Sequence, residues 1–345
     1  MKKYILFLSL LSVTAVTNAQ SGDNKEPYIT KSLSSENIQQ AEVKTSGGSI
    51  TVTGGTGESK IEVYVSGNNG LGMLSKDEIK SRLEEYYTLE VSVSNNKLVA
   101  IAKQKQNNMN WKKSLSISFK IYIPGNVSTD LSTSGGSIKL TGLKGNQNFR
   151  TSGGSLHIDN VSGKINGRTS GGSIHVSNTT DDVDLSTSGG SIEASKCKGN
   201  LQLSTSGGSL NLTDLEGTID ASTSGGRIEG SNITGELSAS TSGGSVKLSN
   251  ISGSVDASTS GGSMDVALTT LGKYVKLHNS GGNIDLQLPK GQGLDLDLSG
   301  NKVKVSSLNN FSGNTEEDNI TGKLNGGGTP IKVRASSGTV RLSFN

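Results

Sequence analysis

The segment Ser206-Gly-Gly-Ser-Leu-Asn-Leu-Thr-Asp-Leu-Glu-Gly-Thr-Ile-Asp-Ala-Ser-Thr223 is one unit of a repeat that fills the middle of the chain. Its opening Ser-Gly-Gly returns every 18 residues, and one more copy at Ser280 comes two residues late. A fixed period of this kind is typical of stacked architectures in which each repeat is one structural unit. The regular copies begin at Ser134, Ser152, Ser170, Ser188, Ser206, Ser224, Ser242 and Ser260.

Apolar residues recur at fixed places within each repeat. Counted from the leading serine as zero, they fall at offsets +4, +6, +9, +13 and +15. Pairs of apolar residues two apart are typical of strands with one face inward, and the spacing that a helix needs does not recur. The repeat therefore predicts two short strands. In the unit from Ser206 the apolar residues are Leu210, Leu212, Leu215, Ile219 and Ala221.

Glycines separate the two predicted strands. One signal is the Gly-Gly pair, such as Gly207 and Gly208, and the other is a glycine at offset +11, which Asp181 replaces in one repeat. Glycine reaches positive φ without steric cost, and Asp tolerates such positions. We therefore expect sharp corners at both places.

A strand-turn-strand unit also fits an array of antiparallel hairpins. Hairpin arrays such as propellers usually have longer strands and aromatic residues at regular places, so we favour stacking. The predicted fold is all-β, a right-handed parallel β-solenoid with 18-residue coils; the handedness follows the preference of parallel crossovers. Equivalent side chains would then stack about 4.8 Å apart, with a ladder of threonines one residue before each leading serine.

The N-terminal residues predict export and a single domain. A basic Met-Lys-Lys start, an apolar run from Tyr4 to Leu11 and Thr17-Asn18-Ala19 are typical of a signal peptide over residues 1–19. Residues 20–37 form a polar leader, and residues 38–345 form one solenoid domain. We expect no transmembrane segment in the mature chain, because the apolar run is too short to span a membrane. The expected location is the periplasm, the outer membrane or the extracellular space.

A small α/β insertion over residues 66–114 interrupts the solenoid near its N-terminus. Ala41 to Val52, followed by Ile61–Val65, is expected to form a first coil. Ser75 and Glu78 make a capping box that predicts a helix from Lys76 to about Tyr87. Two strands joined through Asn95-Asn96 should follow, and then a strand over Leu115–Ile123.

The formal charge of +3 offers no basis for nucleic-acid binding, which needs a concentrated basic surface. Cys197, the only cysteine, stands at offset +9, where five other repeats carry Leu, Ile or Val, so we expect a buried filler. His157 and His175 share offset +5 and should stack about 5 Å apart. We expect no metal or other cofactor there, because no third ligand is evident.

Carboxylates at offset +14 are the candidate ligand contacts of the repeats. Asp184, Asp220 and Asp256 alternate there with neutral residues, which places successive aspartates about 9–10 Å apart. This alternation avoids like-charge contact, and nothing marks one carboxylate as a general acid, so an enzyme is not expected. Trp111, the only tryptophan, is the further candidate, since aromatic faces bind sugars.

Several segments resemble a known family. Ile117 to Pro124-Gly125, Thr133 to Leu140, and the closing Leu324-Asn325-Gly326-Gly327-Gly328 with Ile331-Lys332-Val333 are similar to the bacterial putative-adhesin family of β-strand repeats, a domain of unknown function. The resemblance covers roughly Ile38 to Phe344. It implies a β-helical, exported, non-enzymatic surface protein and supplies no catalytic or ligand residues.

The resulting expectation is an exported structural or adhesin-like interaction protein with an unknown protein or glycan partner. Two alternatives stay open at this point. One is a carbohydrate-binding or carbohydrate-active β-helix protein that uses the aspartates or the aromatics of the insertion. The other is a passive spacer in the cell envelope.

Overall fold

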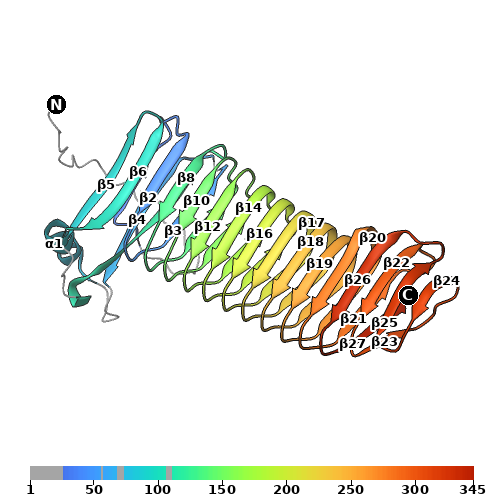
Figure 1. The fold of residues 1–345 in the computed structure, drawn as a ribbon. Coiled ribbons are helices and arrows are strands. Elements are labelled where there is room, and N and C mark those ends of the chain that lie inside the picture. The colour runs from blue at the N-terminus through green and yellow to red at the C-terminus, as the bar shows by residue number, and fades with distance from the viewer. Residues whose placement is uncertain (1–25, 56, 68–73, 106–110) are drawn as a thin grey trace.

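The structure is a computed structural model that describes residues 26–55, 57–67, 74–105 and 111–345. Within these residues the chain forms a long rod of stacked strands, with one α-helix near its N-terminal end (Figure 1). The predicted signal peptide (1–19) and the first residues of the predicted leader lie outside the described residues.

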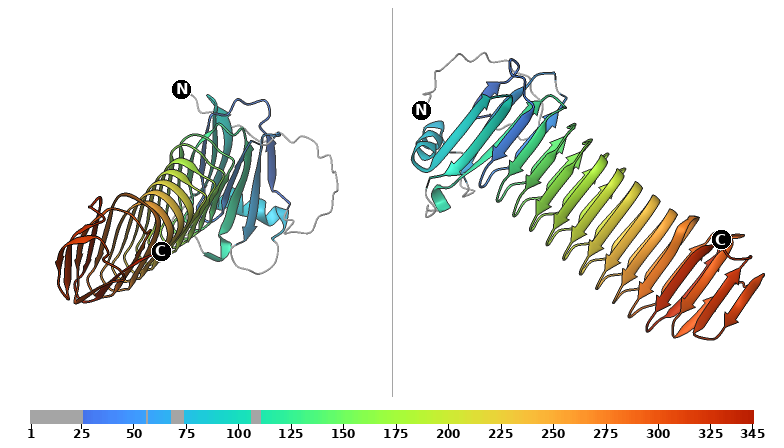
Figure 2. Two further views of the ribbon diagram at one scale, coloured as in Figure 1. Left: turned by 90° about the vertical axis from the view of Figure 1, so that its right-hand side faces the viewer. Right: turned by 45° about the horizontal axis from the view of Figure 1, so that its top comes forward.

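The regular coils build two parallel ladders, which Figure 2 shows as the two layers of the rod. Each residue pairs with the residue 18 positions further along the chain, as Leu210 does with Ile228. The first ladder contains β9 (Ile138–Thr141), β11 (Leu156–Asp159), β13 (Ile174–Ser177) and β15 (Ile192–Ser195). The second ladder contains β8 (Ser128–Ser132), β10 (Gln147–Arg150), β12 (Ile165–Thr169), β14 (Thr180–Thr187) and β16 (Lys198–Thr205). Four strands then run through both ladders: β17 (Leu210–Thr223), β18 (Ile228–Thr241), β19 (Val246–Thr259) and β20 (Met264–Asn279).

The core lies between the two ladders and consists of the predicted apolar positions. In the coil from Ser206, every predicted inward residue from Leu210 to Ala221 is at most 1% exposed. Cys197 is also fully buried in this core, and the burial raises the pKa of its thiol. The predicted inward positions and the predicted burial of Cys197 are both confirmed.

The Gly-Gly corner works differently from the prediction. Neither Gly207 nor Gly208 adopts a left-handed conformation. Instead, a Cβ on Gly208 would lie 2.0 Å from the carbonyl oxygen of Gly190 in the preceding coil. The second glycine of the pair is needed because the stacked backbones approach too closely for a side chain.

The other corner has two left-handed positions. The glycines at offset +11 take positive φ as predicted, and so does Asp181, with φ of 79°. The second position, at offset +8, was not predicted; non-glycine residues there adopt φ between 52° and 55°. These residues are Asn160, Asn178, Lys196, Asp214, Asn232 and Asn250.

The predicted threonine ladder is confirmed, and it joins neighbouring coils. The side chains point inward and are almost fully buried. The Thr205 hydroxyl donates to the Gly190 carbonyl at 2.7 Å and accepts from the Gly208 amide at 3.2 Å. The same pair of bonds recurs at Thr151, Thr169, Thr187, Thr223, Thr241 and Thr259.

At the N-terminal end, β2 (Gln40–Lys44) and β3 (Ile50–Gly54) form a coil of the stack. They pair in parallel with β8 and β9 on one side, and with β6 (Lys97–Gln104) and β7 (Leu115–Ile123) on the other. The prediction that Ile61–Val65 continues this coil is wrong. That segment belongs to β4 (Lys60–Gly67), which pairs antiparallel with β7 and with β1 (Ile29–Ser32).

The predicted helix and hairpin of the insertion are confirmed. Helix α1 (Lys76–Tyr86) has Ser75 as its N-cap. The Ser75 hydroxyl accepts a 3.2 Å hydrogen bond from the amide of Glu78. Strands β5 (Tyr87–Ser94) and β6 pair antiparallel through a turn in which Asn95 and Asn96 have φ of 49° and 59°.

At the C-terminal end, the last two strands of the chain each lie between two strands that precede them in the sequence. β26 (Thr329–Ala335) lies between β20 and β22 (Leu294–Ser299). β27 (Thr339–Phe344) lies between β21 (Ile284–Leu288) and β23 (Lys302–Val305). The hairpin of β24 (Phe311–Thr315) and β25 (Asn319–Leu324) then pairs antiparallel with β22.

Candidate functional site

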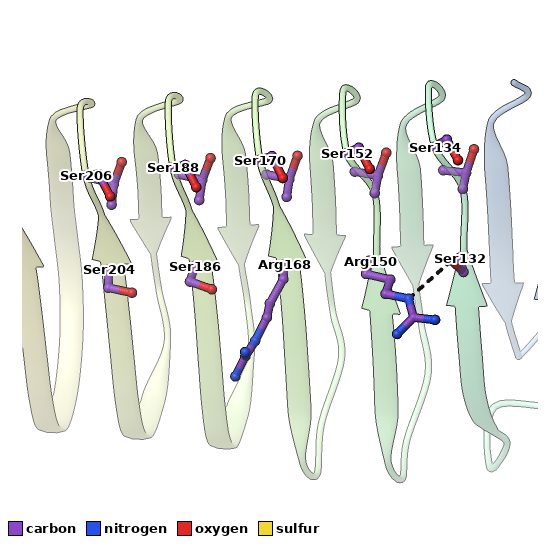
Figure 3. A pocket seen from close by; sticks show the side chains of 15 residues that line it. Ser132, Ser134, Arg150, Ser152, Arg168, Ser170, Ser186, Ser188, Ser204 and Ser206 are labelled. Atoms are coloured by element: carbon purple, nitrogen blue, oxygen red, sulfur yellow. Dashed lines mark hydrogen bonds between the residues drawn. The ribbon is translucent and has the colours of Figure 1, made fainter. Parts of the chain in front are cut away.

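A shallow groove of about 580 Å³ runs along the second ladder, where its strands turn into the Gly-Gly corners (Figure 3). We call it the hydroxyl groove. One side is the row of leading serines from Ser134 to Ser206. The other side is the row of residues two positions earlier, namely Ser132, Arg150, Arg168, Ser186 and Ser204.

The alternation of a β-strand explains why hydroxyl groups gather here. Successive side chains point to opposite faces, so the inward threonine, such as Thr187, separates two outward residues, here Ser186 and Ser188. The backbone ladder continues through the corner, since the Gly189 amide donates to the Ser170 carbonyl at 2.9 Å. The two rows are therefore held in register along the rod.

Arg150 and Arg168 are the only charged residues among those that line the hydroxyl groove. They pair in register on β10 and β12. The Arg150 Nε donates to Ser132 Oγ at 3.3 Å, and Arg168 Nη2 lies 3.8 Å from Asp184 Oδ2. Figure 3 shows the two side chains directed away from each other.

These two arginines are not among the candidates predicted from the sequence, which are acidic, histidine and aromatic residues. Every other regular repeat has serine two positions before its leading serine, so the two replacements were a signal in the sequence.

Two of the predicted aspartates line a second groove of about 620 Å³ on the same ladder, which we call the aspartate groove. Asp184 and Asp220 lie in it on either side of Gln202. The Asn166 side-chain amide donates to Asp184 Oδ2 at 3.0 Å. Asp256 lies further along the same row, opposite Lys276, and does not line this groove.

A tyrosine on the surface beside Asp256 was not predicted. Tyr274 Oη donates to Glu236 Oε1 at 2.6 Å, and the Lys276 ammonium lies 4.6 Å from the ring centroid. The hydrogen bond to Glu236, with a smaller effect of burial, raises the pKa of Tyr274 to about 12. The phenol therefore stays protonated at neutral pH.

The remaining sequence candidates lie apart from both grooves. His157 and His175 stack on the first ladder with ring centroids 5.0 Å apart, as predicted. Trp111 begins the short 3₁₀ helix η1 (Trp111–Lys113) in the N-terminal insertion, and its role as a ligand contact stays a prediction. Within the described ranges, no group of three or more His, Cys, Asp or Glu residues could hold a metal ion.

Comparison with known families identifies the fold. The sequence model of the Toastrack DUF4097 family matches residues 126–343, which is well over half of the chain. The chain belongs to this family. The assignment confirms the resemblance to a putative-adhesin family of unknown function and agrees with the stacked strands of the rod.

Three solved bacterial structures match the chain. A putative cell adhesion protein from Clostridium sporogenes is 12% identical over 92% of this chain and 98% of its own, with a TM-score of 0.20. A putative adhesin from Bacteroides fragilis is 15% identical over 75% and 96%, with a TM-score of 0.35. A putative lipid binding protein from Parabacteroides distasonis is 11% identical over 93% and 98%, with a TM-score of 0.30.

A search of curated proteins found no match to the chain. In the part of the chain that the structure describes, none of the helices has the length and apolar character needed to cross a membrane.

Proposed function

We propose that the chain is an exported, non-catalytic, adhesin-like interaction protein of the cell envelope or surface. In this proposal the rod is a right-handed parallel β-solenoid with 18-residue coils. The observation that supports the proposal is the pair of outward rows along the hydroxyl groove, which offer polar side chains in every coil. The signal-like residues 1–19 support export to the periplasm, the outer membrane or the extracellular space.

The stacked architecture suits binding of an extended partner. Each coil is fixed by backbone pairing and by threonine bonds on both sides, so the outward rows lose little conformational entropy when a partner binds. Solenoids generally use such extended surfaces for recognition. The partner would be a protein or a glycan that lies along the rod.

A carbohydrate-binding or carbohydrate-active protein is the second candidate. Its specific support is the aspartate groove, where Asp184 and Asp220 share one depression with amide side chains. Carboxylates and amides are the groups that hydrogen-bond sugar hydroxyls, and paired carboxylates can act as general acid and base.

A glycan and matrix-protein array tests these candidates together. The full chain and the variant Asp184→Asn/Asp220→Asn/Asp256→Asn are applied to the same array, and hits are tested for turnover. The proposed function predicts saturable binding that the triple variant keeps. Turnover that the triple variant loses would support the enzyme instead, and absence of any saturable ligand would contradict both in favour of a passive spacer.

A further inference from the structure

We propose that the hydroxyl groove binds an acidic polysaccharide along the rod axis, with Arg150 and Arg168 holding its carboxylate or sulfate groups. This inference rests on the proposed function as an interaction protein and adds the class of ligand. It places binding in the hydroxyl groove and not in the aspartate groove.

The two arginines break the charge pattern of their ladder. Between β8 and β19, the outward rows of the second ladder otherwise place no two like charges in neighbouring coils; for example, Asp184 and Asp220 are separated by Gln202. Arg150 and Arg168 pair directly in register. Like charges in direct register are destabilising, and an anion bound between or beside them would remove this repulsion.

Both arginines line the groove and keep N–H donors that make no hydrogen bond. Among the described residues, the two terminal nitrogens of Arg150 make no hydrogen bond, because only its Nε bonds to Ser132. Arg168 forms an ion pair with Asp184 at 3.8 Å, which is too long for a hydrogen bond, so its N–H donors are not used by this contact. Guanidinium forks match carboxylate and sulfate oxygens with two parallel hydrogen bonds, so each arginine has donors left for one acidic group.

The serine rows favour a polyol over other anions. Each hydroxyl can both donate and accept a hydrogen bond, as sugar hydroxyls do. The groove continues from the arginines past Ser186 and Ser188 to Ser204 and Ser206. A small anion would occupy only the part of the groove beside Arg150 and Arg168, whereas a polysaccharide would also use the hydroxyl rows.

Other macromolecules fit the groove less well. Nucleic-acid affinity depends on many phosphate contacts, and single strands also need aromatic platforms; the lining residues supply two arginines and no aromatic ring. Protein interfaces usually have an apolar, aromatic-rich centre, whereas serine and threonine make up the rest of the lining.

The test replaces both arginines by the residue that the other repeats carry. Full-length protein and Arg150→Ser/Arg168→Ser are titrated with polygalacturonate, dextran sulfate, neutral dextran, inorganic sulfate and polyglutamate. The matched control is Arg227→Ser/Lys247→Ser, which removes two exposed positive charges outside the groove and restores serine at a corner. Circular dichroism verifies the fold of each variant.

The expected result is saturable binding of polygalacturonate or dextran sulfate that weakens about tenfold or more per arginine in the groove variant. The control should stay within about twofold, and neutral dextran, inorganic sulfate and polyglutamate should bind far more weakly. The acid group of the tighter polymer identifies carboxylate or sulfate as the preferred group.

Three outcomes would overturn the inference: no binding of either acidic polysaccharide, binding by the groove variant that is no weaker than binding by the control variant, or equally tight binding of polyglutamate. If one of these occurs while the array finds another saturable partner, the inference fails and the proposed function stands. If the array finds none, the proposed function itself fails.

Discussion

At the residue scale, the Gly-Gly corner shows how closely the coils approach. The two glycines of each pair have different surroundings: a Cβ on Gly207 would have ordinary contacts at 3.6 Å, whereas a Cβ on Gly208 would lie 2.0 Å from a backbone oxygen. Backbone on both sides leaves no flexible atom to move aside. The second glycine is therefore the one that stacking requires.

This difference predicts opposite tolerance at neighbouring positions. Gly208→Ala should destabilise the fold by about 1–3 kcal/mol or more, as overpacking does, while Gly207→Ala should change the free energy of unfolding by about 0.5 kcal/mol or less. Urea denaturation of both variants measures this. Equal midpoints for the two variants would contradict the close approach.

The histidine stack predicts a pH dependence. Burial, then the positive charges of His175 and Lys139, hold the pKa of His157 below its usual 6.5, and Glu193 lies on the far side of His175. The unfolded chain therefore takes up a proton first, so this histidine lowers stability as the pH falls through 6.5. His157→Asn, which copies Asn211 at the same offset, should lose less stability between pH 7 and pH 5 in urea titrations. A variant that loses as much as the unaltered protein would refute this assignment.

Single residues were only partly predictable from the sequence. The inward positions were predicted correctly because strand alternation is local, as at Leu210 and Leu212. The role of Gly208 was not, because its neighbour lies 18 residues away. The left-handed Asn160 could have been found, since asparagine is enriched at positive φ. Arg150 and Arg168 could have been found as breaks in a serine row.

At the element scale, the threonine bonds connect each corner to the coil before it. Thr205 uses one hydroxyl to satisfy a carbonyl of the preceding coil and an amide of its own corner. Thr205→Val keeps the shape but removes both bonds, and should lower the free energy of unfolding by about 1–3 kcal/mol. Thr205→Ser keeps the hydroxyl and should cost clearly less. Calorimetric melting of the two variants measures the difference, and equal melting temperatures would show that the hydroxyl does not contribute.

Elements whose signal is local were predicted well, and elements whose partner is distant were not. Helix α1 and the β5–β6 hairpin carry their own cap and turn residues. By contrast, nothing within β4 indicates that it pairs antiparallel with β7. The insertion of β26 between β20 and β22 is likewise set by contacts far apart in the chain.

At the scale of the whole molecule, both ends of the rod depart from the regular stack. β1 and β4 pair antiparallel near one end, and β24 and β25 do so at the other (Figure 1). Open parallel edges would template the addition of further chains. The irregular ends therefore favour a rod of defined length over an open fibre.

Removal of one coil tests most directly whether the rod is a stack of equivalent coils. A chain that lacks residues 206–223 joins Thr205 to Ser224, and Ser224 then takes the place of Ser206, its equivalent 18 residues earlier. We predict that it folds with β-rich circular dichroism and cooperative melting, and that X-ray scattering in solution shows a rod about 4.8 Å shorter. A chain that lacks residues 206–214 loses half a period and should not fold. Failure of the full-period deletion to fold, or equal behaviour of the two deletions, would contradict the stack of equivalent coils.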